Sequence, residues 1–118
     1  MKKSYLKPRS KKGQDRMDRL AKLVKFLIEF RAHGYCEICH DRPDFRGLGG
    51  AHIEPRDYTS ANDTIDNIIV SCAKCHNHDL YPSHEHGGLK ITKTEALHLV
   101  KIKNERYNIA SRWEHLNE

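Results

Sequence analysis

The chain has 118 residues, of which 37% are hydrophobic, and a formal net charge of +5 at pH 7. This length fits one domain, and the modest apolar content predicts a thin core of the kind that a bound metal often stabilises. No stretch of about 18 apolar residues is present, which excludes a membrane-spanning helix. The basic N-terminus lacks the apolar core and cleavage site of a secretory signal, so we expect a cytoplasmic protein.

The positive charge is concentrated at the N-terminal end of the chain. Residues 1–33 hold eleven lysines and arginines against three acidic residues, about +8, so the remainder carries about −3. A clustered basic segment is the pattern expected for a polyanionic partner, most often a nucleic acid. The alternative is a solvated leader that aids solubility. We expect residues 1–13 to form a basic, flexible N-terminal segment and residues 14–118 to form a single domain.

The segment from Gln14 to Ala32 has the apolar spacing of an amphipathic helix, because its apolar residues recur at intervals of three and four. These residues are Met17, Leu20, Leu23, Val24, Leu27 and Ile28. The opposite face carries cations that could be merely solvated or could face a partner: Arg16, Arg19, Lys22, Lys25 and Arg31. His33 and Gly34 then provide a stop signal for the helix.

Two short strands are predicted on either side of a polar loop. The first covers Leu48–Ile53, where alternation puts His52 on the opposite face from its two neighbours. The β-branched segment Asn67–Ser71 makes the second strand. Between them, Glu54–Asp66 is polar and contains Pro55, which predicts a loop.

Helices are predicted after the second strand. A short helix is expected from Cys75 to about Leu80. Thr92 and Glu95 have the spacing of a capping box, which predicts a last helix from Lys93 to about Ala110.

The four cysteines form two Cys-x-x-Cys pairs: Cys36 with Cys39, and Cys72 with Cys75. In a chain without an export signal, this pattern favours a zinc site over disulfides. Two intervening residues let one turn bring both sulfurs to about 2.3 Å from the metal. A closed set of four thiolates leaves no open position, so we expect a structural zinc that joins the first helix to the second strand. Unligated cysteines or a redox pair are the alternatives, and His40 or His76 could replace a sulfur.

Four short motifs follow one another between Cys36 and Leu80: C-E-I-C, A-H-I-E-P, D-N-I-I-V-S-C and C-A-K-C-H. Their combination resembles the zinc-containing form of the HNH nuclease family, over less than half of the chain. The resemblance implies an α+β fold with a ββα-metal core, in which two antiparallel strands and a helix surround a divalent ion. A four-cysteine zinc knot and flanking N- and C-terminal helices would complete it.

The resemblance also assigns roles to three residues. His52 would be the general base, since a neutral imidazole can take a proton from water at cellular pH. Asn67 would hold the loop or orient His52 through its amide. His76 would ligate the catalytic ion, which polarises the scissile phosphate and stabilises the leaving 3′ oxygen. Each has a structural alternative: His52 could be a structural histidine in a short strand, Asn67 could cap a turn, and His76 could be only a neighbour of the zinc ligands.

The sequence departs from the family pattern at two positions where a metal ligand is common. Ala51 stands directly before the expected base, where members commonly have Asp or His. Leu80 lies four residues after His76, where members often have His or Asp. His78 and Asp79 are nearby candidates, and we choose Asp79 because a helix brings a residue three positions on to the same face. More distant candidates are His84 and His86.

We therefore expect a metal-dependent DNA endonuclease that nicks or cleaves DNA, with a structural Zn²⁺ and with Mg²⁺, Mn²⁺ or another divalent ion as catalytic cofactor. The alternative is a zinc-stabilised nucleic-acid-binding module without catalysis. A third hypothesis is a structural zinc protein that binds another protein through its first helix. The resemblance is compatible with a homodimer and with a phage or mobile-element origin, which would place the protein in the host cytoplasm.

Overall fold

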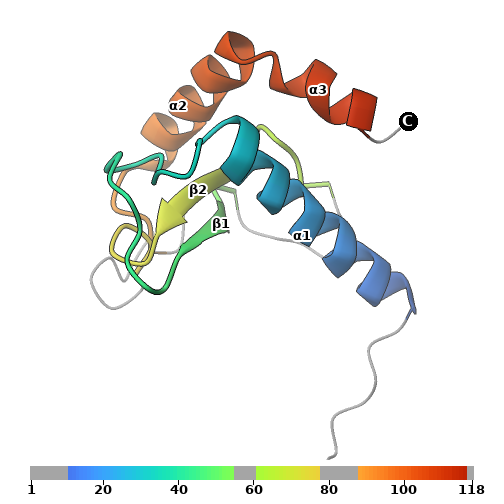
Figure 1. The fold of residues 1–118 in the computed structure, drawn as a ribbon, viewed down its shortest axis with the longest axis horizontal. Helices are drawn as coiled ribbons and strands as arrows, with labels where there is room; N and C mark the ends of the chain where they lie inside the picture. The colour runs from blue at the N-terminus through green and yellow to red at the C-terminus, as the bar shows by residue number, and fades with distance from the viewer. Residues whose placement is uncertain (1–10, 55–60, 78–87, 117–118) are drawn as a thin grey trace, which may run out of the picture.

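The computed structural model describes residues 11–54, 61–77 and 88–116. Along the chain these contain helix α1 (Lys11–Phe30), strands β1 (Leu48–His52) and β2 (Ile68–Cys72), and helices α2 (Lys93–Arg106) and α3 (Ile109–Leu116). Figure 1 shows the three helices around the two-stranded sheet. This arrangement confirms the predicted α+β fold. None of the helices in these residues is long and apolar enough to cross a membrane.

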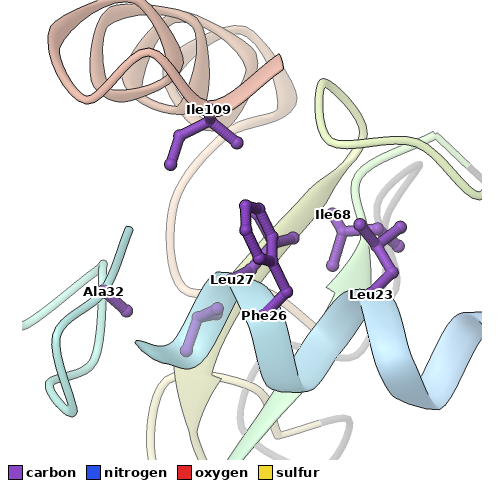
Figure 2. Packing of buried hydrophobic residues seen from close by; sticks show 7 residues of the cluster. Leu23, Phe26, Leu27, Ala32, Ile68 and Ile109 are labelled. Atoms are coloured by element: carbon purple, nitrogen blue, oxygen red, sulfur yellow. The ribbon is translucent and has the colours of Figure 1, made fainter. Parts of the chain in front are cut away.

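Helix α1 packs against the sheet through the apolar stripe that its sequence predicts. Buried Leu23, Phe26 and Leu27 lie in one cluster with Ile68 of β2 and Ile109 of α3 (Figure 2). Contacts between residues so far apart in the sequence join both ends of the chain to the sheet. Burial of such side chains stabilises the fold by roughly 1.5–3 kcal/mol each.

The bounds of α1 differ in part from the prediction. The helix begins at Lys11, inside the segment that we expected to be flexible, whose residues 1–10 lie outside the described part. Beyond its C-terminal end, His33 and Gly34 adopt positive φ angles of 56° and 84°. The amide of Gly34 donates to the carbonyl of Ile28 at 3.0 Å, which is the glycine-dependent stop that the sequence predicts.

The two strands form an antiparallel pair in which Leu48 lies opposite Cys72 and His52 lies opposite Ile68. Both predicted strands are confirmed. All five residues of β2 are buried, so this strand is covered on both faces. Burial on both faces explains why its first three residues, 68–70, are all apolar rather than alternating with polar residues.

The second face of the sheet packs against α2. Ile69 of β2 lies in a separate buried cluster, with Ala51, Ile53, Leu89, Ala96 and Val100. The two neighbours of His52 are both in this cluster. Alternation along β1 therefore places His52 on the opposite face from its two neighbours, as predicted, which is the face that α1 covers.

Gly50 lies where α1 packs tightly on β1. A Cβ atom at Gly50 would lie 2.6 Å from Cγ2 of Val24 and 3.0 Å from Cγ2 of Ile68, whereas a Cβ at Gly49 would have no atom within 4 Å. We expect Gly50→Ala to lower the free energy of unfolding by about 1–3 kcal/mol through overpacking. The control Gly49→Ala should change it by less than about 1 kcal/mol. Urea unfolding of the zinc-loaded variants measures both, and equal midpoints would contradict this packing.

The C-terminal part begins as predicted and continues differently. The capping box is present, since the Glu95 amide donates to Thr92 Oγ1 at 3.1 Å and the Thr92 amide donates to Glu95 Oε1 at 3.0 Å. The prediction of one helix from Lys93 to Ala110 is wrong. Asn108 has a φ of 54° and separates α2 from α3. Asparagine tolerates this left-handed conformation better than most residues, so it can end a helix.

The short helix predicted from Cys75 does not begin there. His76 forms an isolated antiparallel bridge with Leu89 instead. The amide of Asn77 donates to the carbonyl of Gly88 at 2.8 Å. Residues 78–80, the rest of that prediction, lie outside the described residues.

Arg31 is fully buried, contrary to its predicted place on the solvated face of α1. Its guanidinium donates from Nε to Glu37 Oε2 at 2.9 Å and from Nη2 to Glu37 Oε1 at 2.8 Å. Nη1 donates to Asn104 Oδ1 and to the carbonyl of Ile65, both at 2.8 Å. These bonds join the end of α1 to α2 and to the segment before β2.

Glu37 receives further donors besides Arg31. The amide of Val70 donates to its Oε1 at 2.8 Å, and Lys103 Nζ lies 3.2 Å from its Oε2. Glu37 lies between Cys36 and Cys39, and its side chain is fully buried. A buried carboxylate needs such partners because an unpaired charge in the interior is strongly unfavourable. The network fixes the first cysteine pair against β2 and α2.

Candidate functional site

The four cysteines converge on one point. Their Sγ atoms all lie within 4.8 Å of one another. Four ligands about 2.3 Å from a tetrahedral zinc ion stand roughly 3.8 Å apart, and Cys39 Sγ lies 3.8 Å from Cys72 Sγ. All four are free cysteines rather than disulfides. The donor set fits a structural zinc with no open position.

Backbone amides surround these sulfurs. The amides of Ile38 and Cys39 donate to Cys36 Sγ at 3.3 and 3.4 Å. In the second pair, the amides of Cys75 and His76 donate to the carbonyl of Cys72, each at 3.1 Å, and close a tight turn. Amide donors to sulfur favour the charged thiolate, which is the form that binds zinc.

The thiols differ in how readily they ionise. Burial raises the pKa of Cys39 and of Cys75. Burial also acts to raise the pKa of Cys72, but hydrogen bonds from the amides of Cys75 and Lys74 and from neighbouring thiols outweigh it and bring that pKa to about 7. A divalent cation at this site would stabilise the thiolate forms of Cys39 and Cys75 against the effect of burial.

The alternatives for this site involve two histidines. Neither His40 nor His76 belongs to the group of side chains close enough together to hold an ion. His40 is exposed and adopts a positive φ of 65°, which lets the chain turn away after Cys39. The four sulfurs therefore form the metal-competent group, as the sequence predicts.

His52 lies at the end of β1, with 13% of its side chain exposed. Its Nε2 lies 2.8 Å from Oδ1 of Asp63, whose side chain is 8% exposed. The loop between the strands thus returns a carboxylate to the imidazole. A histidine held by a carboxylate is oriented for proton transfer.

Asp63 is shared with α1. Arg16 donates from Nε to Asp63 Oδ2 at 2.8 Å and from Nη2 to Asp63 Oδ1 at 3.3 Å. The Arg16 guanidinium holds the pKa of the Asp63 carboxyl below its ordinary value, against the effect of burial, and the bond with His52 acts in the same direction. Asp63 is therefore ionised at neutral pH while it contacts both residues.

Sequence reasoning missed Asp63 and the role of Arg16. Asp63 lies within a polar loop in which acidic residues are ordinary, and Arg16 counted as one of several cations on a helix face. The pair is 47 residues apart in sequence. No spacing rule connects residues at that separation, so only the fold brings them together.

Asn67 lies at the start of β2 and closes the loop. Its Oδ1 accepts from the amide of Glu54 at 2.7 Å, and its Nδ2 donates to the carbonyls of Glu54 at 3.1 Å and Asn62 at 2.9 Å. The side chain is thus bound to Glu54, where the loop begins, and to Asn62, the residue directly before Asp63. This geometry corresponds to the loop-holding alternative for Asn67, with its effect on His52 passing through the loop.

The remaining predicted site residues are only partly described. His76 is half-buried, and His78 and Asp79, the expected companions, lie outside the described residues, as do His84 and His86. Ala51 is 3% exposed among apolar side chains on the face of β1 opposite His52. Within residues 11–54, 61–77 and 88–116, the four cysteines are the only group of three or more potential ligands close enough to hold an ion.

Comparison with known families gives a match to the HNH endonuclease model over residues 36–79. This stretch matches the HNH domain. It contains both cysteine pairs, His52, Asn67 and His76, whereas Arg16 lies outside it. The HNH domain indicates a nuclease or a nucleic-acid-binding function, and it confirms the resemblance found in the sequence. Comparison with curated proteins and with solved structures gives no match.

Proposed function

We propose that this protein is a metal-dependent DNA endonuclease in which His52 is the general base. The observation that carries the proposal is the contact of 2.8 Å between His52 Nε2 and the Asp63 carboxylate, inside an HNH domain. The imidazole is held at the C-terminal end of β1 and is mostly shielded from water, yet it keeps part of its surface exposed. Such a group is positioned to take a proton from a water molecule at a phosphodiester.

The proposed reaction is hydrolysis. His52 takes one proton from water, and the resulting hydroxide attacks the phosphorus atom. The bond from phosphorus to the 3′ oxygen breaks, and that oxygen leaves with the electron pair and takes a proton from solvent, giving a 5′ phosphate and a 3′ hydroxyl. The Asp63 carboxylate stabilises the positive charge that forms on the imidazole, as carboxylates do in other histidine-based sites. A positioned base of this kind accelerates the reaction by about 10²–10⁴-fold.

A catalytic divalent ion is part of the proposal. His76 would hold it, with Asp79 as the proposed second ligand and His78 as the alternative. When bound, Mg²⁺ or Mn²⁺ would reduce the negative charge at the scissile phosphate and at the leaving oxygen. Ala51 offers no donor atom, so the ligand set differs from the common family pattern at that position.

DNA is the proposed substrate. Arg19, Lys22 and Lys25 are exposed on α1, and the chain before residue 13 adds further lysines and an arginine. Lysine and arginine side chains contact backbone phosphates and make binding sensitive to salt. We infer that the N-terminal basic segment and α1 bind the DNA backbone beside the HNH domain.

One observation favours a second function, DNA binding without catalysis. Ala51 is buried in an apolar cluster, at the position where the family commonly has a metal ligand. A protein of this kind would retard DNA in a salt-sensitive manner without breaking strands. The zinc site and the basic segment would then serve binding alone.

Plasmid relaxation separates the two functions. We expect the purified, zinc-loaded protein to convert supercoiled plasmid to nicked or linear forms with Mg²⁺ or Mn²⁺. A brief addition of EDTA, which binds the free divalent ions, should prevent this conversion. Gel retardation in the same buffers measures binding. Retardation without strand breaks in Mg²⁺, Mn²⁺, Ni²⁺ or Zn²⁺ would exclude the nuclease and support the binding module.

A further inference from the structure

The chain of contacts from α1 to the imidazole extends beyond the HNH domain. Arg16 contacts Asp63 with two nitrogens, and Asp63 contacts His52 with one oxygen. The side chains of Arg16, Asp63 and His52 are 15%, 8% and 13% exposed. All three are thus mostly shielded from water, which strengthens their interactions relative to those of surface pairs.

The chemistry of Asp63 determines which imidazole nitrogen carries the hydrogen. An ionised carboxylate can only accept hydrogen bonds, and aspartate is ionised at neutral pH. The atom of His52 within 2.8 Å of that carboxylate is Nε2. Nε2 must therefore donate, and in the neutral ring Nδ1 then has the lone pair.

Arg16 fixes the position of Asp63. Its two donors approach the two carboxylate oxygens separately, so rotation of the carboxylate would break at least one bond. Arg16 belongs to α1, which is itself packed on β2 through the apolar cluster of Leu23 and Leu27. The orientation of Asp63 thus depends on how α1 is seated on the sheet.

We propose that Asp63, held by Arg16 of α1, is a positioning residue that keeps His52 in the Nε2–H tautomer, so that Nδ1 is the atom that takes the proton from water. This inference deepens the proposed function and rests on it. It makes α1 part of the catalytic apparatus, although α1 lies outside the matched HNH domain.

The tautomer can be measured without any reaction. Long-range ¹H–¹⁵N correlation spectra of the zinc-loaded protein above neutral pH distinguish Nε2–H from Nδ1–H rings, and the spectrum of His52→Ala assigns the signal. We expect wild-type His52 to be the Nε2–H tautomer. In Asp63→Asn, whose amide can both donate and accept, and in Arg16→Met, the two tautomers should mix.

Cleavage kinetics of the same proteins give the second readout. We expect Asp63→Asn to lower kcat by about 10- to 100-fold with little change in KM, because a misplaced base affects the chemical step rather than binding. Arg16→Met should show a smaller loss of kcat. Matched controls remove the same charges from exposed positions on α2, Glu105→Gln for Asp63 and Lys101→Met for Arg16, and should behave as wild type.

The outcomes separate this inference from the proposed function. An Nδ1–H tautomer in the wild-type protein, or wild-type kcat in Asp63→Asn while His52→Ala is inactive, would overturn the inference and leave the nuclease in place. Failure of the wild-type protein to cleave DNA with every ion would overturn the proposed function and with it the catalytic role of Asp63. The tautomer is measured in the wild-type protein, and a variant is used only to assign its signal, so poor folding of Asp63→Asn or Arg16→Met does not prevent the test.

Discussion

Replacing Cys72 with serine is expected to unfold the protein at neutral pH. Cys72 is one of four sulfurs within 4.8 Å of one another, and it is the residue at which β2 ends. Structural zinc sites contribute about 10–16 kcal/mol of apparent binding free energy in small domains. That contribution exceeds the net stability of most domains of this size, about 5–15 kcal/mol. Loss of one ligand should therefore abolish the folded state or leave a small fraction of it.

Three measurements on purified protein check this expectation. Elemental analysis should give one zinc per wild-type chain and little zinc in Cys72→Ser. Circular dichroism should show loss of helix in the variant and in wild-type protein after prolonged chelation. The control is His40→Gly, because His40 is adjacent to Cys39, lies outside the ligand group and has a φ of 65°, which glycine adopts freely. A folded, metal-free wild-type protein would contradict a structural zinc.

Replacing Glu37 with alanine is expected to cost about 3–5 kcal/mol of stability, because it leaves the Arg31 guanidinium buried without its carboxylate. Both side chains are fully buried and joined by two hydrogen bonds. The Val70 amide and Lys103 lose the same acceptor. Urea unfolding of zinc-loaded protein measures the change in the free energy of unfolding.

A double variant tests whether the unpaired charge of Arg31 causes the loss of stability. In Arg31→Met combined with Glu37→Leu, neither charge is present, and apolar replacements of buried ion pairs are often tolerated. We expect the double variant to be more stable than Glu37→Ala, although the partners on α2 and β2 stay unpaired. As a surface control, Asp44→Ala breaks an exposed pair with Arg46 and should leave the unfolding midpoint near that of the wild type. Equal effects of Glu37→Ala and Asp44→Ala would contradict the buried network.

The features that were predictable from sequence are those whose chemistry is local. Two residues between cysteines fit a zinc turn wherever they occur, and Thr92 with Glu95 needs only its own helix end to form a capping box. The strands followed from alternation around His52 and from the β-branched run that begins at Ile68. The break at Asn108 also had a local signal, because asparagine is one of the few residues that ends a helix in the left-handed region.

The features that were missed depend on partners far along the chain. Arg31 has the helical spacing of a solvent-facing cation, but in the fold its guanidinium bonds to Asn104, 73 residues away, as well as to Glu37. Asp63 is one of several acidic residues in a polar loop, and its contacts with Arg16 and His52 appear only when α1 lies on the sheet. A charged residue in a sequence is expected to lie on the surface. Only the tertiary fold shows which charged residues are buried instead.

In the candidate site, too, some features follow from local motifs and others depend on residues far apart in the sequence. The family motifs predicted where His52, Asn67 and the cysteines would stand, and the structure brings the cysteines together and binds Asn67 to the loop of Asp63. The catalytic roles of His52, Asn67 and His76 stay predictions. The other ligands of the catalytic ion also stay predictions, because Ala51 stands at a position where the family commonly has a metal ligand.

The measurement that tests the central claim most directly is the single-turnover rate of plasmid nicking by His52→Ala in Mg²⁺ or Mn²⁺. Our account predicts a rate about 10²–10⁴-fold below that of the wild type, the contribution of a positioned general base. His98→Ala, which removes an exposed histidine of α2, should cleave at the wild-type rate. Cleavage by His52→Ala at the wild-type rate would contradict the account.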